Sequence, residues 1–285
     1  MKNIRIIPRL DIKGPNLVKG IHLEGLRVLG LPEQFAEYYY KTGADELIYT
    51  DVVASLYGRN SLIDIIKKTV KNIFIPLTVG GGLRTLDDIK NVLRAGADKV
   101  SLNTMAIKNP EIIREASKRF GSSTILISIE AIKQPDGRYL AFIENAREGT
   151  GVEVFSWAKK VEELGAGEIL LTSVDKEGTG AGFDLELTRA VAEAVSIPVI
   201  ANGGAGKLED IKEVIKEGRA DAVSLASVLH YDFVKNHSGA DNVSKNKTEG
   251  NTEFLKSGRT SSKITTAGLP EIKSYLAKQG INCRN

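Results

Sequence analysis

The chain has 285 residues, of which 42% are hydrophobic and 26% charged, and its formal net charge is +3. This is the composition of a globular protein with a sizeable core, and the weak charge disfavours a surface that binds nucleic acid. A single cysteine, Cys283, excludes an internal disulfide framework and a cysteine-based zinc site. The first residues lack the apolar core of a signal peptide, and no apolar run reaches the roughly 18 residues of a membrane span. We therefore predict a cytoplasmic protein without a membrane partner.

Short apolar or β-branched runs alternate with longer amphipathic segments along the chain. Eight runs are typical of buried strands, at residues 4–12, 46–53, 76–80, 99–103, 124–131, 168–175, 198–203 and 222–227. Helical periodicity falls at residues 32–42, 61–72, 85–95, 110–120, 154–164, 184–195, 207–217 and 270–279. Eight strand–helix units predict a (β/α)8 TIM barrel that forms one domain over residues 1–285. A doubly wound open sheet is the alternative.

One glycine-rich segment occurs twice. With one inserted residue, Arg219, residues 76–102 align with residues 198–225 and share the glycine pairs and the final Val-Ser-Leu. Residues 43–104 and 165–227 have the same predicted order of strands and helices. This repeat favours a closed barrel made of two duplicated half-barrels over the open sheet.

Residues 236–266 are rich in Ser, Thr, Asn, Gly and Lys and poor in apolar side chains. Such a composition cannot bury enough surface to offset the entropy lost on ordering. We predict a flexible surface insertion after strand 8, on the face where barrel active sites lie. A lid that orders over substrate is the alternative.

The repeated glycine turns follow strands 3 and 7, at the end of the barrel where substrates bind. Glycine lets backbone N–H groups approach an anion closely, and a helix N-terminus favours negative charge. The residues that we predict to bind phosphate are Gly81, Gly82, Asn103 and Thr104 in a first cradle and Gly203, Gly204, Ala226 and Ser227 in a second cradle. Two cradles at one mouth favour a substrate with a phosphate at each end, although tight turns copied with the fold are the alternative.

Two carboxyl groups are the predicted catalytic residues. Asp11 ends strand 1 and Glu130 ends strand 5, so they face each other across the mouth. General acid–base catalysis requires such a pair, with pKa values that their surroundings separate. Asp51 and Asp175, which end strands 2 and 6, are secondary candidates for substrate binding, with helix capping or a solvated loop as the alternative for each.

Four charged residues stand at the opposite end of the barrel. Arg5, Glu46, Lys99 and Glu168 open strands 1, 2, 4 and 6, and period-2 alternation turns them inward. Buried charges must compensate one another, so the four side chains are expected to form a ring. The ring is either a salt-bridged plug or a gate for a small molecule.

Several motifs make the chain resemble the cyclase subunit of imidazole glycerol phosphate synthase over residues 1–232 and 267–284. They include "LDIK", "LVKG", "TVGGG", "GADKVS", "GAGEILLTS" and "GGAGK". The resemblance implies a glutaminase subunit docked on the barrel floor, whose ammonia travels through the barrel. It also implies that ammonia attacks a bisphosphorylated ribulosyl formimino aminoimidazole carboxamide nucleotide, giving imidazole glycerol phosphate and aminoimidazole carboxamide ribotide.

The resemblance assigns roles to individual residues. The catalytic aspartates of the family fall on Asp11 and Glu130, and a lysine of its first loop falls on Lys19. Its ammonia gate falls on Arg5, Glu46, Lys99 and Glu168, and an acidic residue of the glutaminase interface falls on Asp98. Neither a metal nor a cofactor is expected.

Two positions depart from the family pattern. Glu130 is one methylene longer than aspartate, and Arg9 stands where the family has a small residue. Arg9 is expected to point into the barrel, to pair with Asp11 or Glu130 and lower a carboxyl pKa, and to narrow the ammonia path. The departures favour an alternative, a paralogue that delivers ammonia from a glutaminase to a sugar amidotransferase of surface-polysaccharide (lipopolysaccharide) biosynthesis. A single-chain isomerase and a non-catalytic scaffold are further alternatives.

Overall fold

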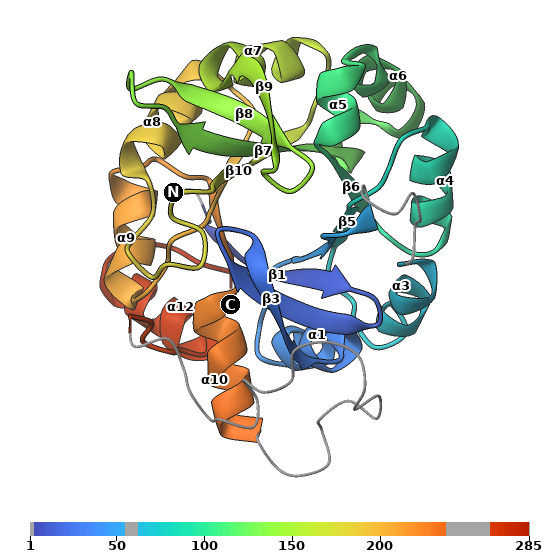
Figure 1. Ribbon diagram of the computed structural model, residues 1–285. Coiled ribbons are helices and arrows are strands. Elements are labelled where there is room, and N and C mark those ends of the chain that lie inside the picture. Colours follow the sequence, from blue (N-terminus) through green and yellow to red (C-terminus); the bar gives the residue numbers. More distant parts are fainter. Residues whose placement is uncertain (1–2, 55–61, 238–262, 285) are drawn as a thin grey trace.

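Eight parallel strands close into a barrel in the computed structural model, which describes residues 3–54, 62–237 and 263–284 (Figure 1). In barrel order they are β1 (Arg5–Lys13), β4 (Leu47–Asp51), β5 (Leu77–Gly80), β6 (Lys99–Leu102), β7 (Ile125–Lys133), β10 (Glu168–Ser173), β11 (Val199–Asn202) and β12 (Ala222–Leu225). The pairing of β12 with β1 closes the barrel. The prediction of a TIM barrel is confirmed.

Helices surround the barrel (Figure 1). They are α1 (Pro32–Lys41), α3 (Ile63–Thr69), α4 (Leu86–Arg94), α5 (Thr104–Lys108), α6 (Glu111–Phe120), η1 (Ser122–Thr124), α7 (Val154–Glu163), α8 (Leu185–Ala194), α9 (Leu208–Lys216), α10 (Ser227–His237) and α12 (Leu269–Lys278). Local chemistry explains their positions. For example, Thr85 and Asp88 form a capping box that starts α4, and Ile89 and Val92 turn its apolar face to the barrel. All of the predicted helices are present, with α3 shorter than its predicted range.

Two β-hairpins extend the barrel wall at the mouth, and the sequence analysis missed both. They are β2 (Asn16–Ile21) with β3 (Glu24–Gly30), which continue from β1, and β8 (Tyr139–Ile143) with β9 (Glu148–Glu153), which continue from β7. The turn of the first hairpin is formed by His22 and Leu23, both with positive φ. Such turns are usually marked by Asn-Gly, so this sequence does not signal the hairpin.

Three layers fill the interior of the barrel. An apolar layer is formed by inward-pointing side chains of six strands: Ile7, Ile48, Leu126, Leu170, Ile200 and Ala222. Every second residue of β1 points into the barrel. Of these residues, Arg5 lies on the floor side of the apolar layer, and Arg9 and Asp11 lie on its mouth side. The apolar layer therefore separates two sets of charged groups.

Some predicted boundaries are corrected. Strand β12 ends at Leu225, and Ser227 begins α10 rather than ending a strand. Of the predicted insertion at 236–266, residues 238–262 lie outside the described residues. Its described ends are ordered: α10 includes residues 236 and 237, Ile264 is buried, and the backbone N–H of Thr265 donates to the Gly206 carbonyl at 2.7 Å. Within the described ranges, no helix has the length and apolar character required to cross a membrane.

Candidate active site

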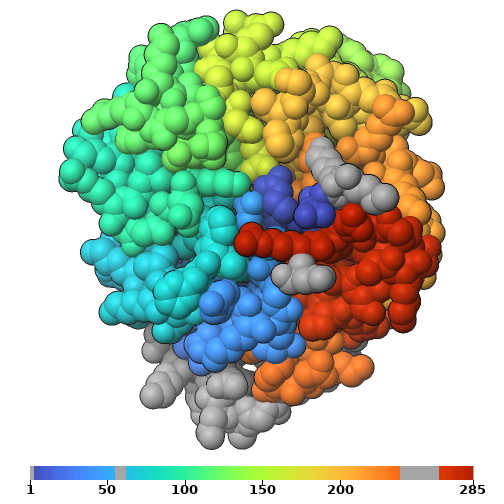
Figure 2. All heavy atoms as spheres, turned by 180° about the vertical axis from the view of Figure 1, so that it is seen from behind, coloured from blue at the N-terminus to red at the C-terminus, as the bar shows by residue number. Residues whose placement is uncertain are grey.

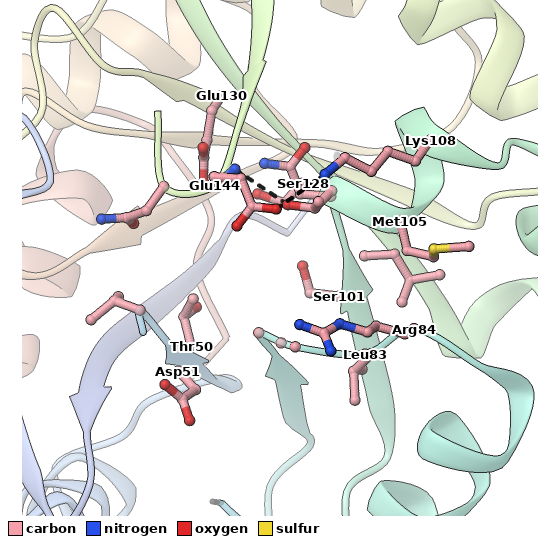
Figure 3. A pocket seen from close by; sticks show the side chains of 18 of the residues that line it. Thr50, Asp51, Leu83, Arg84, Ser101, Met105, Lys108, Ser128, Glu130 and Glu144 are labelled. Carbon is pink, nitrogen blue, oxygen red and sulfur yellow. Dashed lines mark hydrogen bonds and ion pairs between the residues drawn. The ribbon is translucent and has the colours of Figure 1, made fainter. Parts of the chain in front are cut away.

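The first cradle forms one side of a cavity of about 410 Å³ at the mouth (Figure 3). Gly81 has φ of 96°, and a Cβ atom there would lie 2.3 Å from the Asp51 carbonyl oxygen, so only glycine fits this turn. Asn103 donates from Nδ2 to the Phe142 carbonyl at 3.2 Å, whereas its buried Oδ1 has no hydrogen-bond partner among the described residues. Thr104 accepts from the backbone N–H of Glu144 at 3.3 Å. The cradle is therefore open and has hydrogen-bonding groups that a ligand can use.

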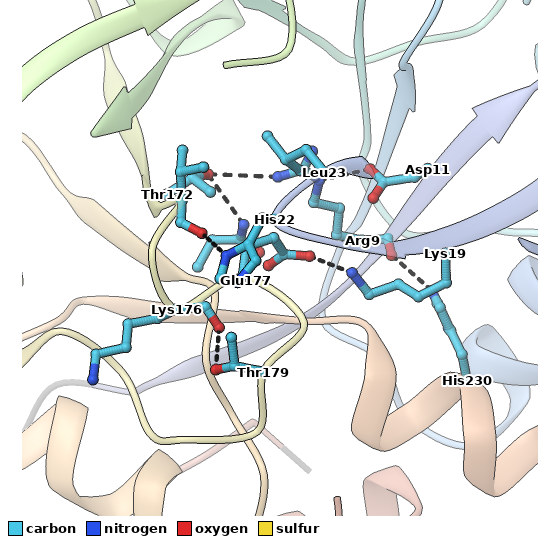
Figure 4. A network of polar contacts seen from close by, with 12 residues as sticks. Arg9, Asp11, Lys19, His22, Leu23, Thr172, Lys176, Glu177, Thr179 and His230 are labelled. Carbon is cyan, nitrogen blue, oxygen red and sulfur yellow. Dashed lines mark hydrogen bonds and ion pairs between the residues drawn. The ribbon is translucent and has the colours of Figure 1, made fainter. Parts of the chain in front are cut away.

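The second cradle has little free space. Gly203, Gly204, Ala226 and Ser227 line a cavity of about 20 Å³, together with Lys19 and Glu177. The Lys19 ammonium is paired with the Glu177 carboxylate (Figure 4), and both side chains are buried, with 2% and 5% of their surface exposed. Burial opposes ionisation of Glu177, but Lys19 and Arg9 hold its pKa below the ordinary value. The cradle is thus filled by an ion pair of the protein itself.

Sequence analysis missed Glu177. It lies in the loop after β10, where "DKEGTGAG" follows the strand end. A carboxylate next to glycines beyond a barrel strand is a signal for a site residue, and it was available in the sequence.

Arg9 connects the two predicted catalytic carboxyl groups, because it binds Asp11 and lines the first cavity together with Glu130. Arg9 is 4% exposed, and its Nε donates to Asp11 Oδ1 at 2.9 Å, which confirms the expected pairing (Figure 4). Burial raises the Glu130 pKa to about 7, against the opposing effects of the Ala146 backbone N–H and of Arg9. Arg9 lowers the pKa of Glu130, as expected, but desolvation outweighs this attraction, so the net shift of the Glu130 pKa is upward.

The four charged residues of the floor form a closed ring. Arg5 Nη1 contacts Glu46 at 2.8 Å, Lys99 Nζ contacts Glu46 at 2.9 Å and Glu168 at 3.2 Å, and Arg5 Nη2 also binds Glu168. Burial opposes the charge of Arg5, but the two carboxylates hold its pKa above the ordinary value. Each cation is shared by both anions, as mutual compensation requires.

The remaining predicted residues lie in different places. Asp51 lines the first cavity, and its Oδ1 accepts from the Val53 backbone N–H at 3.0 Å. Asp175 lies beyond the end of β10, is exposed, accepts from the Lys133 backbone N–H at 2.8 Å and lines neither cradle. Asp98 is exposed and accepts from the Leu77 backbone N–H at 2.9 Å, next to Lys99 on the floor side. Asp51, but not Asp175, therefore lines one of the two cradle cavities.

Comparison with known proteins identifies the family. The sequence profile described as "Histidine biosynthesis protein" matches residues 5–235. The chain is 60% identical over 210 residues to the imidazole glycerol phosphate synthase subunit HisF of Legionella pneumophila, covering 74% of this chain and 99% of the relative. This chain belongs to the HisF family. HisF proteins of Prochlorococcus marinus (strain MIT 9215) and Alkaliphilus metalliredigens (strain QYMF) are 52% and 46% identical, each covering 81% of this chain and 91% of the relative.

Membership of the HisF family confirms the resemblance that the motifs indicated. It makes the chain a cyclase subunit, and so a lyase, of histidine biosynthesis. A subunit of a synthase implies a partner subunit.

Proposed function

We propose that the mouth of the barrel binds the bisphosphorylated ribulosyl formimino aminoimidazole carboxamide nucleotide and adds ammonia to it. The products are imidazole glycerol phosphate and aminoimidazole carboxamide ribotide. The first cradle binds one phosphate end of the substrate and the second cradle binds the other, so that the reacting centre lies over Asp11 and Glu130.

The observation that carries this proposal is the pair of unlike carboxyl groups at the mouth. A group with a pKa of about 7 is populated in both protonation states at neutral pH, so Glu130 serves as the general acid. Asp11, hydrogen-bonded to Arg9, serves as the general base that takes a proton from the attacking ammonia. Exchange of protons between these two groups supports the ring closure and the loss of the leaving group.

We infer that the partner subunit is a glutaminase of the HisH type, docked on the barrel floor. Figure 2 shows this face, where the start of the chain (dark blue) lies beside the carboxyl-terminal segment (red). Asp98 contributes to the interface in this proposal. Ammonia enters through the ring of Arg5, Glu46, Lys99 and Glu168 and passes the apolar layer to the mouth.

The route of ammonia is tested with Lys99→Met. Loss of one cation breaks the ring, so glutamine-dependent turnover is expected to fall while ammonium-dependent turnover is retained. Lys41→Met, on an exposed lysine that pairs only with Glu37 in the described part of the chain, is the matched control. If the ratio of glutamine-dependent to ammonium-dependent turnover is the same in both variants, the ring does not act as an ammonia gate.

The reaction is tested by supplying the bisphosphorylated nucleotide and ammonium salt to the isolated chain and measuring the imidazole product. Asp11→Asn is expected to lower kcat by about 100- to 10,000-fold, the range for loss of a general base. Asp87→Asn, on the first turn of α4, is the control. Absence of product from the folded wild-type chain would overturn the proposal.

A second candidate is delivery of glutaminase-derived ammonia to a sugar amidotransferase. The observation that favours it is the buried Arg9, which engages Asp11 at 2.9 Å and reaches Thr172 of β10 at 3.5 Å. In this function the floor ring still admits ammonia into the barrel, but the residues at the mouth do not convert the nucleotide. The ammonium assay above separates the two candidates.

A further inference from the structure

The second cradle, as it stands, is too small for the phosphate that the proposed function places there. A cavity of about 20 Å³ has room for about one water molecule. The first cradle opens into a cavity of about 410 Å³. The two turns share a glycine pair, Gly81-Gly82 and Gly203-Gly204, but the space in front of them differs.

The Glu177 carboxylate takes up the space in front of the second cradle. A Cβ atom on Gly203 would lie 3.3 Å from Glu177 Oε2, so the carboxylate stands directly at the glycine turn. Lys19, delivered by β2, holds it there. A carboxylate bound by an ammonium at a glycine turn is arranged as a bound phosphate would be.

A second observation shows that the cradle is built for a polar ligand. Ser224 lines the same cavity and is 2% exposed, and its Oγ has no hydrogen-bond partner among the described residues. A buried hydroxyl without a partner is costly, so a ligand oxygen in this position is expected to stabilise it. The side-chain amide of the neighbouring Asn202, in contrast, has a partner, because its Nδ2 donates to Thr172 Oγ1 at 3.1 Å.

We propose that Glu177 is a specificity-determining residue that occupies the second cradle in the free protein and is displaced by a phosphate group of the substrate. This inference rests on the proposed function, because it names the competitor for one end of the same substrate. Lys19 exchanges the carboxylate for the phosphate, so its buried charge is compensated in both states. Glu177 lies in a loop with Gly178, Gly180 and Gly182, all with positive φ, where the backbone can adopt conformations closed to other residues.

Hairpin β2–β3 is hydrogen-bonded to the loop that carries Glu177. The His22 backbone N–H donates to the Glu177 carbonyl at 2.9 Å, and His22 Nδ1 lies 2.8 Å from the Val174 carbonyl. Displacement of Glu177 is therefore expected to change contacts of the hairpin as well as of the cradle. Phosphate binding and the position of the hairpin are coupled in this proposal.

The test measures binding of inorganic phosphate to the full chain by calorimetry. Glu177→Gln removes the competing charge, so phosphate is expected to bind the second cradle about 10- to 100-fold more tightly than in wild type. Glu186→Gln, which removes an exposed carboxylate near the same loop, is the matched control and is expected to leave the affinity unchanged. Ser227→Asp combined with Glu177→Gln places a carboxylate back in the cradle and is expected to abolish the gain.

Two results overturn the inference: the same phosphate affinity in Glu177→Gln and wild type, or a gain that Ser227→Asp does not remove. If the Gln variant does not fold, Glu177→Asp withdraws the carboxylate by one methylene and keeps its charge, and a smaller gain is then expected. No gain in that variant overturns the inference too. If the phosphate test gives either of these results while the chain still forms the imidazole product from ammonium, the inference about Glu177 is wrong and the proposed function stands. If the phosphate test succeeds but no imidazole product forms, the proposed reaction is wrong and the exchange of Glu177 for phosphate stands.

Discussion

The two cradles of the mouth have similar turns and different contents. Around the first, hairpin β8–β9 places Glu144 at the rim, where it pairs with Lys108 at 3.4 Å and leaves the cavity open. Around the second, hairpin β2–β3 sends Lys19 inward to meet Glu177. The groups that distinguish the sites, Glu144 and Lys108 at the first and Lys19 and Glu177 at the second, come from outside the glycine-rich segments 76–102 and 198–225, so a repeated turn does not by itself fix what the site binds.

The largest expected effect concerns Arg9, which lies between the cradles. It binds Asp11 and attracts both Glu177 and Glu130, and all four side chains are buried. Removing one partner from a buried ionic group leaves uncompensated charge, so Arg9→Ala is expected to lower the free energy of unfolding by about 3–5 kcal/mol. Urea denaturation measures the change.

Arg138→Ala is the control for Arg9, because Arg138 is an exposed arginine paired with Asp136. Its effect is expected to stay within about 0.5 kcal/mol. If both variants lose equally little stability, Arg9 does not link the two cradles energetically.

The two buried glutamates are expected to respond to pH in opposite directions. The pKa of Glu130 is raised to about 7 in the folded chain, so its protonated form stabilises the fold below about pH 4.5 and this stability is lost as pH rises through 7. The shift corresponds to at most about 3 kcal/mol. The pKa of Glu177 is lowered, so its contribution is present at neutral pH and is lost as pH falls.

Urea denaturation at several pH values separates these contributions. Glu130→Gln is expected to remove a decrease in stability between about pH 5 and pH 7, whereas Glu177→Gln is expected to flatten the acid limb. If Glu130→Gln and Glu177→Gln change the dependence of stability on pH in the same direction, the two glutamates do not respond to pH in opposite ways.

Much of this difference could not be predicted from the sequence. The eight strands follow from the short apolar runs, and the floor ring follows from alternation along each strand, because Arg5, Ile7, Arg9 and Asp11 must share one face. The hairpins do not, since His22 and Leu23 do not mark a turn. The pairing of Lys19 with Glu177 joins residues 158 positions apart and depends on how the first hairpin leans over the mouth. Whether the repeat reflects two duplicated half-barrels remains a prediction.

The smallest expected effect comes from making the first cradle resemble the second. Asn103→Asp adds a carboxylate beside the open turn, in a side chain of nearly the same shape, and repulsion is expected to weaken inorganic phosphate binding there about tenfold. Asn91→Asp, on the exposed face of α4, adds the same charge away from the cavity and is expected to change little. Calorimetric titration compares the two variants with wild type. An unchanged affinity in Asn103→Asp, beside a gain in Glu177→Gln, would mean that a carboxylate weakens phosphate binding at the second cradle but not at the first.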